Sequence, residues 1–227
     1  MYLGIDIGTS EVKTLLLDDT HHVIGVAGAT LEVSRPHPGH SEQDPQSWWT
    51  TTQSALATLQ TQHPDAYSKV QAIGLSGQMH GAVLLDKHNV VLRPAILWND
   101  VRSAQECLDM MSELPTLPQL AGSLAMPGFT APKLRWVATH EPQIFANVAK
   151  VLLPKDYLRL LLTGDHVSDM SDASGTMWLD VANRRWSPEL LALTHLNEAH
   201  MPRLVEGSAA SGVLSASASQ VTPKTCQ

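Results

Sequence analysis

A carboxylate, a glycine and two hydroxyls stand close together near the start of the chain, in the stretch Asp6-Ile7-Gly8-Thr9-Ser10. Gly8 lets backbone N–H groups approach an anion closely, and the hydroxyls of Thr9 and Ser10 add donors suited to phosphate oxygens. A carboxylate beside a phosphate repels it unless a cation lies between them, so Asp6 implies Mg²⁺. Lys13 could add a further positive charge. These residues predict a magnesium-dependent phosphate site, with an ordinary tight hairpin as the alternative.

A second group of side chains suits an uncharged hydroxylated molecule. It is Gln78-Met79-His80, which stands between Gly77 and Gly81. An amide and an imidazole can each donate and accept hydrogen bonds, so they match sugar hydroxyls in both senses. The apolar run before them predicts a strand, and ligands of α/β sheets commonly bind at the carboxyl ends of strands. We interpret these three residues as substrate-binding, with a hydrogen-bonded histidine in a turn as the alternative.

A third group follows the apolar run Pro94 to Leu97. Its members can stack on a sugar face and bind several hydroxyls: Trp98, Asn99, Asp100 and Arg102. We add these four residues to the predicted substrate site. The alternative is that Asp100 and Arg102 form an ion pair and that Ser103 caps a helix.

Strand and helix signals indicate how these groups are positioned. Two β-branched runs flank the Gly-Thr-Ser turn and predict a hairpin, which a third strand extends. Asp44 caps a helix that opens at Pro45 and runs to Gln62, and this crossover leads into a buried parallel strand. The predicted strands are Tyr2 to Ile7, Val12 to Leu17, Val23 to Ser34 and Val70 to Ser76. Further helices are predicted from Ser103, Pro132, Pro142 and Asp156.

The segment Ser168 to Ser174 is richer in Asp and Ser than packing requires. We interpret its carboxylates as caps of local backbone N–H groups. The alternative is a turn cluster near the ligand cleft.

Composition bounds the class of protein. The chain has 227 residues, 43% of them hydrophobic, which suffices for a sizeable core. The net charge of −7 and the absence of a Lys/Arg cluster argue against a nucleic-acid partner. Two distant cysteines, Cys107 and Cys226, suggest neither a zinc site nor a disulfide. The sequence shows no secretory leader and no apolar run near the ~18 residues of a membrane helix, so we expect a cytoplasmic protein without membrane contact.

Several motifs together resemble one family. The first loop is not a Walker A motif and resembles the first phosphate motif of the actin-like ATPases. Taken in order, the stretches Gly4 to Ser10, Ser41 to Pro45, Gly77 to Gly81, Trp98 to Arg102, Met126 to Lys133, Leu153 to Arg159 and Ser168 to Thr176 look like those of the FGGY carbohydrate kinases, closest to the bacterial xylulokinases. The resemblance covers about residues 1 to 208.

The resemblance implies an α/β, actin-like (ribonuclease H-like) fold with a mixed sheet and helices on both faces. It implies ATP and Mg²⁺ as cofactors and phosphorylation of D-xylulose at its 5-hydroxyl. It also implies that Met79 and His80 contact the substrate and that Asp6 lies near the metal and phosphates. A homodimer is left open.

The sequence departs from the family after Gly207. We expect an N-terminal sugar-binding domain over residues 1–207 and a low-complexity tail or truncated end over 208–227. The family continues into a Gly-Gly-Asp motif with the catalytic base and into a second domain, and neither is present in these residues. Two hypotheses stand: part of a sugar kinase that is inactive by itself, or a sugar-binding module without turnover. The kinase could also take another ketose or polyol, and a chaperone-type ATPase is disfavoured.

Overall fold

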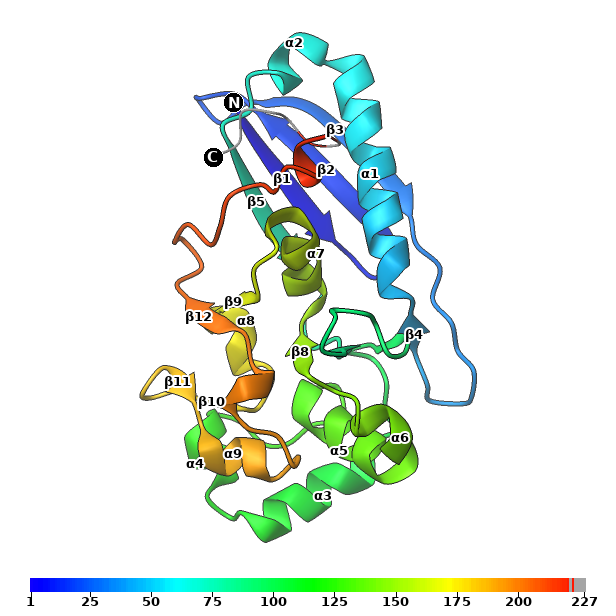
Figure 1. The fold of residues 1–227 in the computed structure, drawn as a ribbon, viewed down its shortest axis with the longest axis vertical. Helices are drawn as coiled ribbons and strands as arrows, with labels where there is room; N and C mark the ends of the chain where they lie inside the picture. The colour runs from blue at the N-terminus through cyan, green and yellow to red at the C-terminus, as the bar shows by residue number, and fades with distance from the viewer. Residues whose placement is uncertain (221, 223–227) are drawn as a thin grey trace.

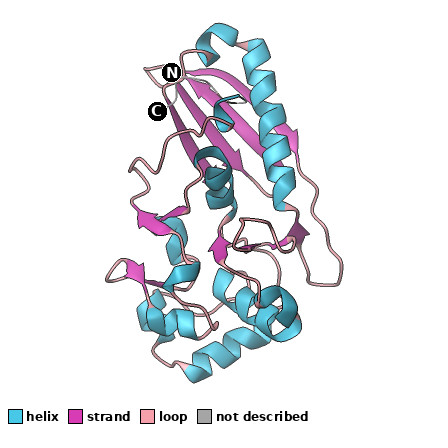
Figure 2. Ribbon diagram, viewed as in Figure 1, coloured by secondary structure: helices cyan, strands magenta, loops and turns pink. Residues whose placement is uncertain are grey.

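The computed structural model of the chain describes residues 1–220 and residue 222. Its upper part is a mixed four-stranded sheet (Figures 1 and 2). The strands are β1 (Tyr2–Ile7), β2 (Glu11–Leu17), β3 (Val23–Thr30) and β5 (Ala72–Gly77), in the order β3-β2-β1-β5. β1 pairs antiparallel with β2 and parallel with β5. The predicted hairpin and the predicted parallel strand are therefore confirmed.

Alternation along the strands gives this sheet two different faces. Leu3, Ile5 and Ile7 of β1 are buried in one core cluster, whereas Tyr2 and Asp6 point to the opposite, exposed face. On β5 the exposed residues are Ala72, Gly74 and Ser76. The predicted burial of this strand is wrong, because β5 is an edge strand whose outer face carries small and polar residues that need no cover.

Helices cover the apolar face of the sheet. α1 (Pro45–Gln62) begins after Asp44, whose carboxylate accepts a hydrogen bond from Gln46 N, as the sequence predicts. α7 (Pro154–Thr163) ends at Gly164, which has the left-handed φ of 85° common at helix C-termini. Both helices contribute to the core cluster that includes Leu3 and Ile5. Within residues 1–220 and 222, α1 and α7 are the longer helices that contact the strands of this sheet.

The lower part of the molecule holds a second core (Figure 1). Its helices include α3 (Ala104–Glu113), α4 (Leu117–Ala121), α5 (Thr130–His140), α6 (Pro142–Phe145), α8 (Met170–Ser174) and α9 (Pro188–Ala192). Short strands accompany them: β4 (Glu42–Gln43), β6 (Val83–Leu85), β7 (Ala95–Ile96), β8 (Lys150–Leu152), β9 (Val167–Asp169), β10 (Leu179–Asp180), β11 (Arg185–Trp186) and β12 (Arg203–Val205). These strands pair only as two-stranded sheets. The lower lobe is therefore built mainly of helices and loops.

Residues 208–217 have little regular structure, and a short 3-10 helix follows at Ala218–Gln220. Part of this segment packs against the first lobe. Ala218 is 1% exposed and belongs to its core cluster, and Ser215 N donates a hydrogen bond of 2.8 Å to Leu162 O. The low-complexity composition therefore does not keep the segment away from the core.

Two sequence-based expectations concern cysteines and membranes. Cys107 is a buried free thiol, and burial with the nearby Glu106 raises its pKa to about 11. Cys226 lies outside the described residues.

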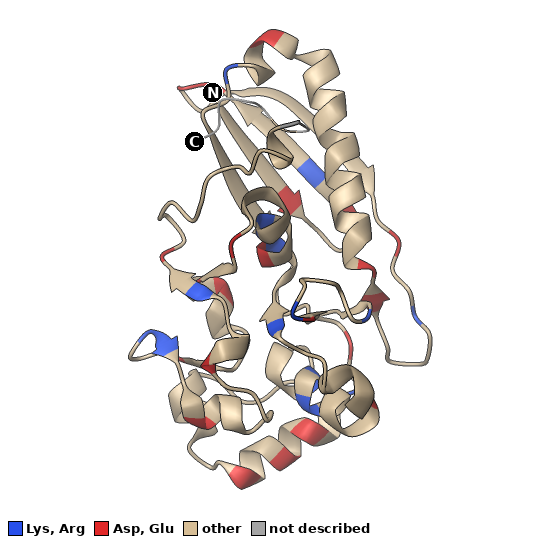
Figure 3. Ribbon diagram, in the orientation of Figure 1, with Lys and Arg blue, Asp and Glu red and all other residues tan. Residues whose placement is uncertain are grey.

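No helix within residues 1–220 and 222 is long and apolar enough to cross a bilayer. Lysine and arginine are spread over both lobes (Figure 3).

Candidate functional site

A cavity of about 620 Å³ opens at the carboxyl end of β5, between the two lobes. It is lined by Leu75, Ser76, Gly77, Met79, His80, Ala121, Gly122, Ser123, Phe129, Lys155, Asp169, Ser171, Asp172, Ser174, Gly175 and Val181. Its volume falls within the range of small-molecule sites, and polar groups converge on it from several elements. It is therefore the candidate ligand site.

His80 enters this cavity in a constrained conformation. Its φ of 65° lies in the left-handed region, which is uncommon for non-glycine residues and which His21 and His195 also adopt in this chain. Its ring meets Phe129 edge to face, with ring centroids 4.6 Å apart. Burial and the nearby Lys133 ammonium lower the pKa of His80 to about 4, so the ring is neutral at pH 7. A neutral imidazole can both donate and accept a hydrogen bond, as a sugar hydroxyl requires. Met79 beside it is 48% exposed.

A cluster of buried charges borders the cavity, and its members Lys155, Asp169 and Asp172 line it. We call it the Lys155 cluster, and it consists of Lys155, Asp156, Arg159, Asp169 and Asp172. Lys155 Nζ lies 2.7 Å from Asp156 Oδ1, 2.9 Å from Asp169 Oδ2 and 2.8 Å from Asp172 Oδ2. Burial lowers the pKa of Lys155, but Asp156 and Asp172 outweigh it and the net shift is upward. Burial raises the pKa of Asp172 above its usual value, even though Lys155 opposes this.

The sequence allowed two interpretations of the segment Ser168 to Ser174: carboxylates that cap local backbone, and a turn cluster near the ligand cleft. Both apply to Asp169. Its Oδ1 accepts a hydrogen bond of 3.0 Å from Asp172 N and so caps α8. Its Oδ2 binds Lys155 at the cavity wall. The predicted capping role is confirmed, and the segment also reaches the cavity.

Asp6 and Lys13 lie next to the cavity on the exposed face of the sheet. Asp6 is the in-register partner of Lys13 on β2 and of Ser76 on β5, and Ser76 lines the cavity. Neighbouring strands are about 4.8 Å apart. Lys13 Nζ lies 2.6 Å from Glu11 Oε1, and this contact raises the pKa of Lys13. The Asp6 carboxylate makes no hydrogen bond to any residue among 1–220 and 222.

The turn between β1 and β2 is tightly built. Gly8 N donates to Glu11 O at 3.0 Å, and a Cβ on Gly8 would lie 2.9 Å from that oxygen, so the turn requires glycine. The Thr9 hydroxyl donates to Gln78 Oε1 and accepts from Trp98 Nε1. Of the predicted phosphate donors, the Ser10 hydroxyl has no hydrogen bond to the described part of the chain.

Gln78 is buried and ties its own loop to the turn between β1 and β2. Its Nε2 donates to Gln43 Oε1 at 2.8 Å, and its Oε1 accepts from the Thr9 hydroxyl at 3.3 Å. Gln43 in turn donates to Thr9 O and accepts from Trp48 Nε1. The polar groups of Gln78 are thus used within the fold. Trp98 and Asn99 are exposed and lie outside the cavity lining.

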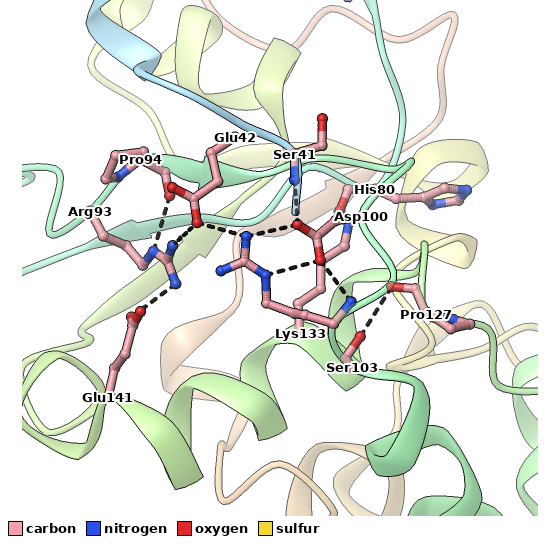
Figure 4. Close-up of polar contacts among 11 residues, drawn as sticks. Ser41, Glu42, His80, Arg93, Pro94, Asp100, Ser103, Pro127, Lys133 and Glu141 are labelled. Carbon is pink, nitrogen blue, oxygen red and sulfur yellow. Dashed lines mark hydrogen bonds and ion pairs between the residues drawn. The ribbon is translucent and has the colours of Figure 1, made fainter. Parts of the chain in front are cut away.

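Asp100 and Arg102 belong to a second group of buried charges, and neither residue lines the cavity. Figure 4 labels Glu42, Arg93, Asp100 and Glu141 of this group. We call it the Arg102 cluster, and it consists of Glu42, Arg93, Asp100, Arg102 and Glu141. Asp100 accepts hydrogen bonds from Ser41 N, Arg102 N, Arg102 Nε and Arg102 Nη2. Arg102 also pairs with Glu42 at 2.7 Å, and Arg93 bridges Glu42 and Glu141. Burial opposes ionisation of Asp100, but the bonds from Arg102 and Ser41 hold its pKa below the usual value.

The structure therefore separates the predicted site residues into three sets. Met79 and His80 line the cavity. Asp6, Gly8, Thr9, Ser10 and Lys13 lie on the adjacent turn and sheet face. Gln78, Trp98, Asn99, Asp100 and Arg102 are outside the lining, and their sugar contacts remain predictions.

Cavity residues that the sequence reasoning did not assign come from distant segments: Phe129, Lys155, Ser171 and Gly175 among them. Two signals pointed to these segments: the excess of Asp and Ser between Ser168 and Ser174, and the family resemblance of the stretches Met126 to Lys133, Leu153 to Arg159 and Ser168 to Thr176. Phe129 and Lys155 themselves carry no local signal, because an aromatic and a lysine beside a helix start are common.

Comparison with known proteins agrees with this geometry. The sequence profile of the FGGY family of carbohydrate kinases, N-terminal domain, matches residues 1–224. The chain is 55% identical to a xylulose kinase of Escherichia coli strain K12 over 94% of its own length, and 38% identical to one of Lactococcus lactis. It spans 44% and 43% of these two relatives.

Solved structures give the same result. The crystal structure of a xyloylose kinase from Brucella ovis matches with a TM-score of 0.94 and 56% identity, covering 95% of this chain and 45% of that one. A glycerol kinase from Plasmodium falciparum, at 19% identity and a TM-score of 0.90, shares the fold, covering 98% of this chain and 46% of that chain. The chain belongs to the FGGY family of carbohydrate kinases, whose actin-like fold it has, and it corresponds to the N-terminal domain of that family.

Proposed function

We propose that this chain supplies the sugar site and part of the phosphate site of an ATP-dependent kinase that converts D-xylulose to D-xylulose 5-phosphate. The observation that carries the proposal is the register of three strands. Ser76 lines the cavity, Asp6 is its neighbour on the next strand, and Lys13 follows on the third. A sugar hydroxyl in the cavity would lie beside the groups that suit a metal and phosphates, as phosphoryl transfer requires.

The residues on the sheet face fit Mg²⁺. Asp6 offers an exposed carboxylate that is not hydrogen-bonded to the described residues, and Mg²⁺ is commonly held by one or two carboxylates with phosphate oxygens and water. No group of three or more His, Cys, Asp or Glu able to form an all-protein metal site occurs in the described range. When bound, Mg²⁺ would neutralise charge on the transferred phosphate. Lys13 and Ser10 would bind phosphate oxygens beside it.

His80 and Met79 are the proposed substrate contacts. The neutral His80 ring would hydrogen-bond a sugar hydroxyl, and Met79 would cover an apolar part of the sugar. A protein of this function is expected in the cytoplasm, and a homodimer is compatible with it. A sugar-binding module without turnover is the second candidate, because the polar side chains that line the cavity suit a hydroxylated ligand whether or not a phosphate is transferred.

The first test measures D-xylulose binding to the purified chain by NMR titration. His80→Ala should weaken binding by about tenfold, because a hydrogen bond left unmade in a site costs about 1–3 kcal/mol. His166→Ala is the matched control, since His166 also has a lowered pKa but lies outside the cavity lining. Asp6→Ala should leave sugar affinity nearly intact. Equal affinity of wild type and His80→Ala would contradict the proposed contact.

The second test separates the two candidates. In a coupled ADP-release assay with D-xylulose and Mg-ATP, we expect no turnover by the 227-residue chain. Loss of a general base alone typically slows a reaction by about 10²–10⁴-fold. Turnover within a few-fold of the roughly 1–100 s⁻¹ of ordinary kinases would show that the base lies in this chain. Sugar binding without turnover would support the proposed division of the site.

A further inference from the structure

The main-chain carbonyl of His80 is hydrogen-bonded by two side chains of a helix that is distant in sequence. Its carbonyl oxygen accepts hydrogen bonds from Lys133 Nζ at 2.8 Å and from Thr130 Oγ1 at 3.2 Å. Both donors come from the beginning of α5, more than 45 residues further along the chain. The φ of His80 is 65°, a left-handed conformation that costs free energy in a non-glycine residue and that hydrogen bonds to the main chain can stabilise. These two bonds fix the position of the His80 carbonyl.

A buried lysine is an energetically unfavourable donor for such a hydrogen bond. Its side chain is fully buried, at 0% exposure, and burial lowers its pKa to about 7. Burying an ammonium is unfavourable unless a specific partner compensates. The hydrogen-bond partner that the structure shows for Nζ is the His80 carbonyl. Simple packing would be served better by methionine or leucine.

The His80 ring is located by a second contact. Gly175 has a φ of −74°, which any residue adopts, so backbone conformation does not require glycine there. A Cβ on Gly175 would lie 2.3 Å from His80 Cε1 and 2.6 Å from Nδ1, whereas the next atom, Asp172 O, is 3.5 Å away. The His80 ring alone therefore excludes a side chain at position 175. Phe129 limits the ring by its edge-to-face contact.

We propose that Lys133 and Gly175 are positioning residues for His80: Lys133 fixes its main chain, and Gly175 leaves the space that its ring occupies. This inference rests on the proposed role of His80 as a sugar contact. It adds that positions 80 and 175 form a coupled pair. A larger residue at 175 excludes the histidine ring, so the pair determines which polar group faces the sugar.

The Gly175 half is tested with Gly175→Ala and the matched control Gly74→Ala, where a Cβ would meet nothing within 4 Å. In protein with ¹³C-labelled histidine, Gly175→Ala should shift the His80 ring resonance, lower the urea midpoint and weaken D-xylulose binding at least about fivefold. Gly74→Ala should leave the His80 resonance and D-xylulose binding unchanged and should not lower the urea midpoint. In a His80→Ala background, Gly175→Ala should no longer lower the urea midpoint.

Two outcomes would overturn this half. One is an unmoved His80 resonance in Gly175→Ala. The other is an equal loss of stability with and without the His80 ring, including failure of both variants to fold. Wild-type protein that does not bind D-xylulose would reject the proposed function, but the resonance and the double-mutant comparison would still decide the inference.

The Lys133 half is tested with Lys133→Met. The control is Lys150→Met, because Lys150 also donates to a backbone carbonyl, Met201 O, at 3.2 Å. Lys133→Met should raise the pKa of the His80 ring, since a nearby cation is removed, and should weaken D-xylulose binding about fivefold or more. Thr130→Val removes the other donor and decides the matter if Lys133→Met does not fold. An unchanged His80 titration and affinity in the folded variant would refute the role of Lys133.

Discussion

The Arg102 cluster and the Lys155 cluster contain the same charges, three carboxylates and two cations, but they use them differently. In the Arg102 cluster both Asp100 oxygens accept hydrogen bonds, and two planar guanidiniums bridge the carboxylates. In the Lys155 cluster one ammonium is shared by three carboxylates, and Asp156 Oδ2 and Arg159 Nε are buried without a hydrogen-bond partner in the described residues. The first cluster is saturated, and the second is not.

The difference follows from the chemistry of the two cations. A guanidinium presents several donors in a fixed plane and can satisfy two carboxylates at once, whereas an ammonium acts as a compact point charge. The saturated cluster lies outside the cavity and joins β4, the Trp98 to Arg102 loop and the start of α6. Lys155, Asp169 and Asp172 of the unsaturated cluster line the cavity. We infer that the first stabilises the fold and that the second can respond to a ligand or a proton.

The largest expected effect comes from breaking the saturated cluster. Arg102→Met should lower the free energy of unfolding by about 3–5 kcal/mol, because it leaves the buried Asp100 carboxylate without its partner. Urea unfolding monitored by tryptophan fluorescence measures this. The control is Arg184→Met, which breaks an exposed pair with Glu206 and should cost less than about 1 kcal/mol. A loss below that value for Arg102→Met would remove the distinction.

A smaller effect distinguishes the clusters by the sign of their pH dependence. The folded-state pKa of Asp100 is lowered, so its stabilisation is present above the unfolded value of 3.8 and is lost as pH falls through the folded value. Asp100→Asn should therefore be roughly 2 kcal/mol less stable than wild type at pH 7, with the difference shrinking in acid.

Asp172 should behave in the opposite way. Its folded-state pKa is raised, so the stability linked to it is present below 3.8 and is lost as pH rises through the folded value. Asp172→Asn should be at least as stable as wild type at pH 7. Urea unfolding of both variants and of wild type from about pH 2 to pH 7 makes the comparison, because this range spans the titration windows on both sides of 3.8. A parallel decline of the two variants would show that both clusters are structural ion pairs of one kind.

Much of the fold was predictable because local signals and tertiary structure agree. The hairpin around Gly8, the cap at Asp44 and the helix end at Gly164 are set by turn and cap chemistry that sequence shows directly. The open face of β5 was not predictable in the same way. A run such as Ile73 to Ser76 is compatible with burial on both sides, and only the neighbouring elements decide how much is covered.

The residues of the candidate site also separate into those that local sequence signals predict and those that only tertiary contacts reveal. Met79 and His80 stand at a strand end between glycines, so a sequence pattern predicts their place at the cavity. Asp100 and Arg102 gave an equally strong polar signal but form a buried ion pair, which was the alternative interpretation. Lys133 and Gly175 could not be assigned, since each acts through contact with His80 across more than 45 residues of chain.

The smallest expected effect concerns His80, beside the unsaturated cluster. Its folded-state pKa of about 4 lies below the ordinary 6.5, so the stability linked to it is present above 6.5 and is lost as pH falls towards 4. Because the ring is partly exposed, we expect this loss to be only about 1 kcal/mol. His80→Asn should remove that part of the acid sensitivity and leave the part due to the carboxylates. In the wild-type protein, the Hε1 resonance of His80 should not titrate between about pH 5.5 and 8. A titration midpoint near 6.5 would mean that the His80 ring is solvated and free of the constraints described above.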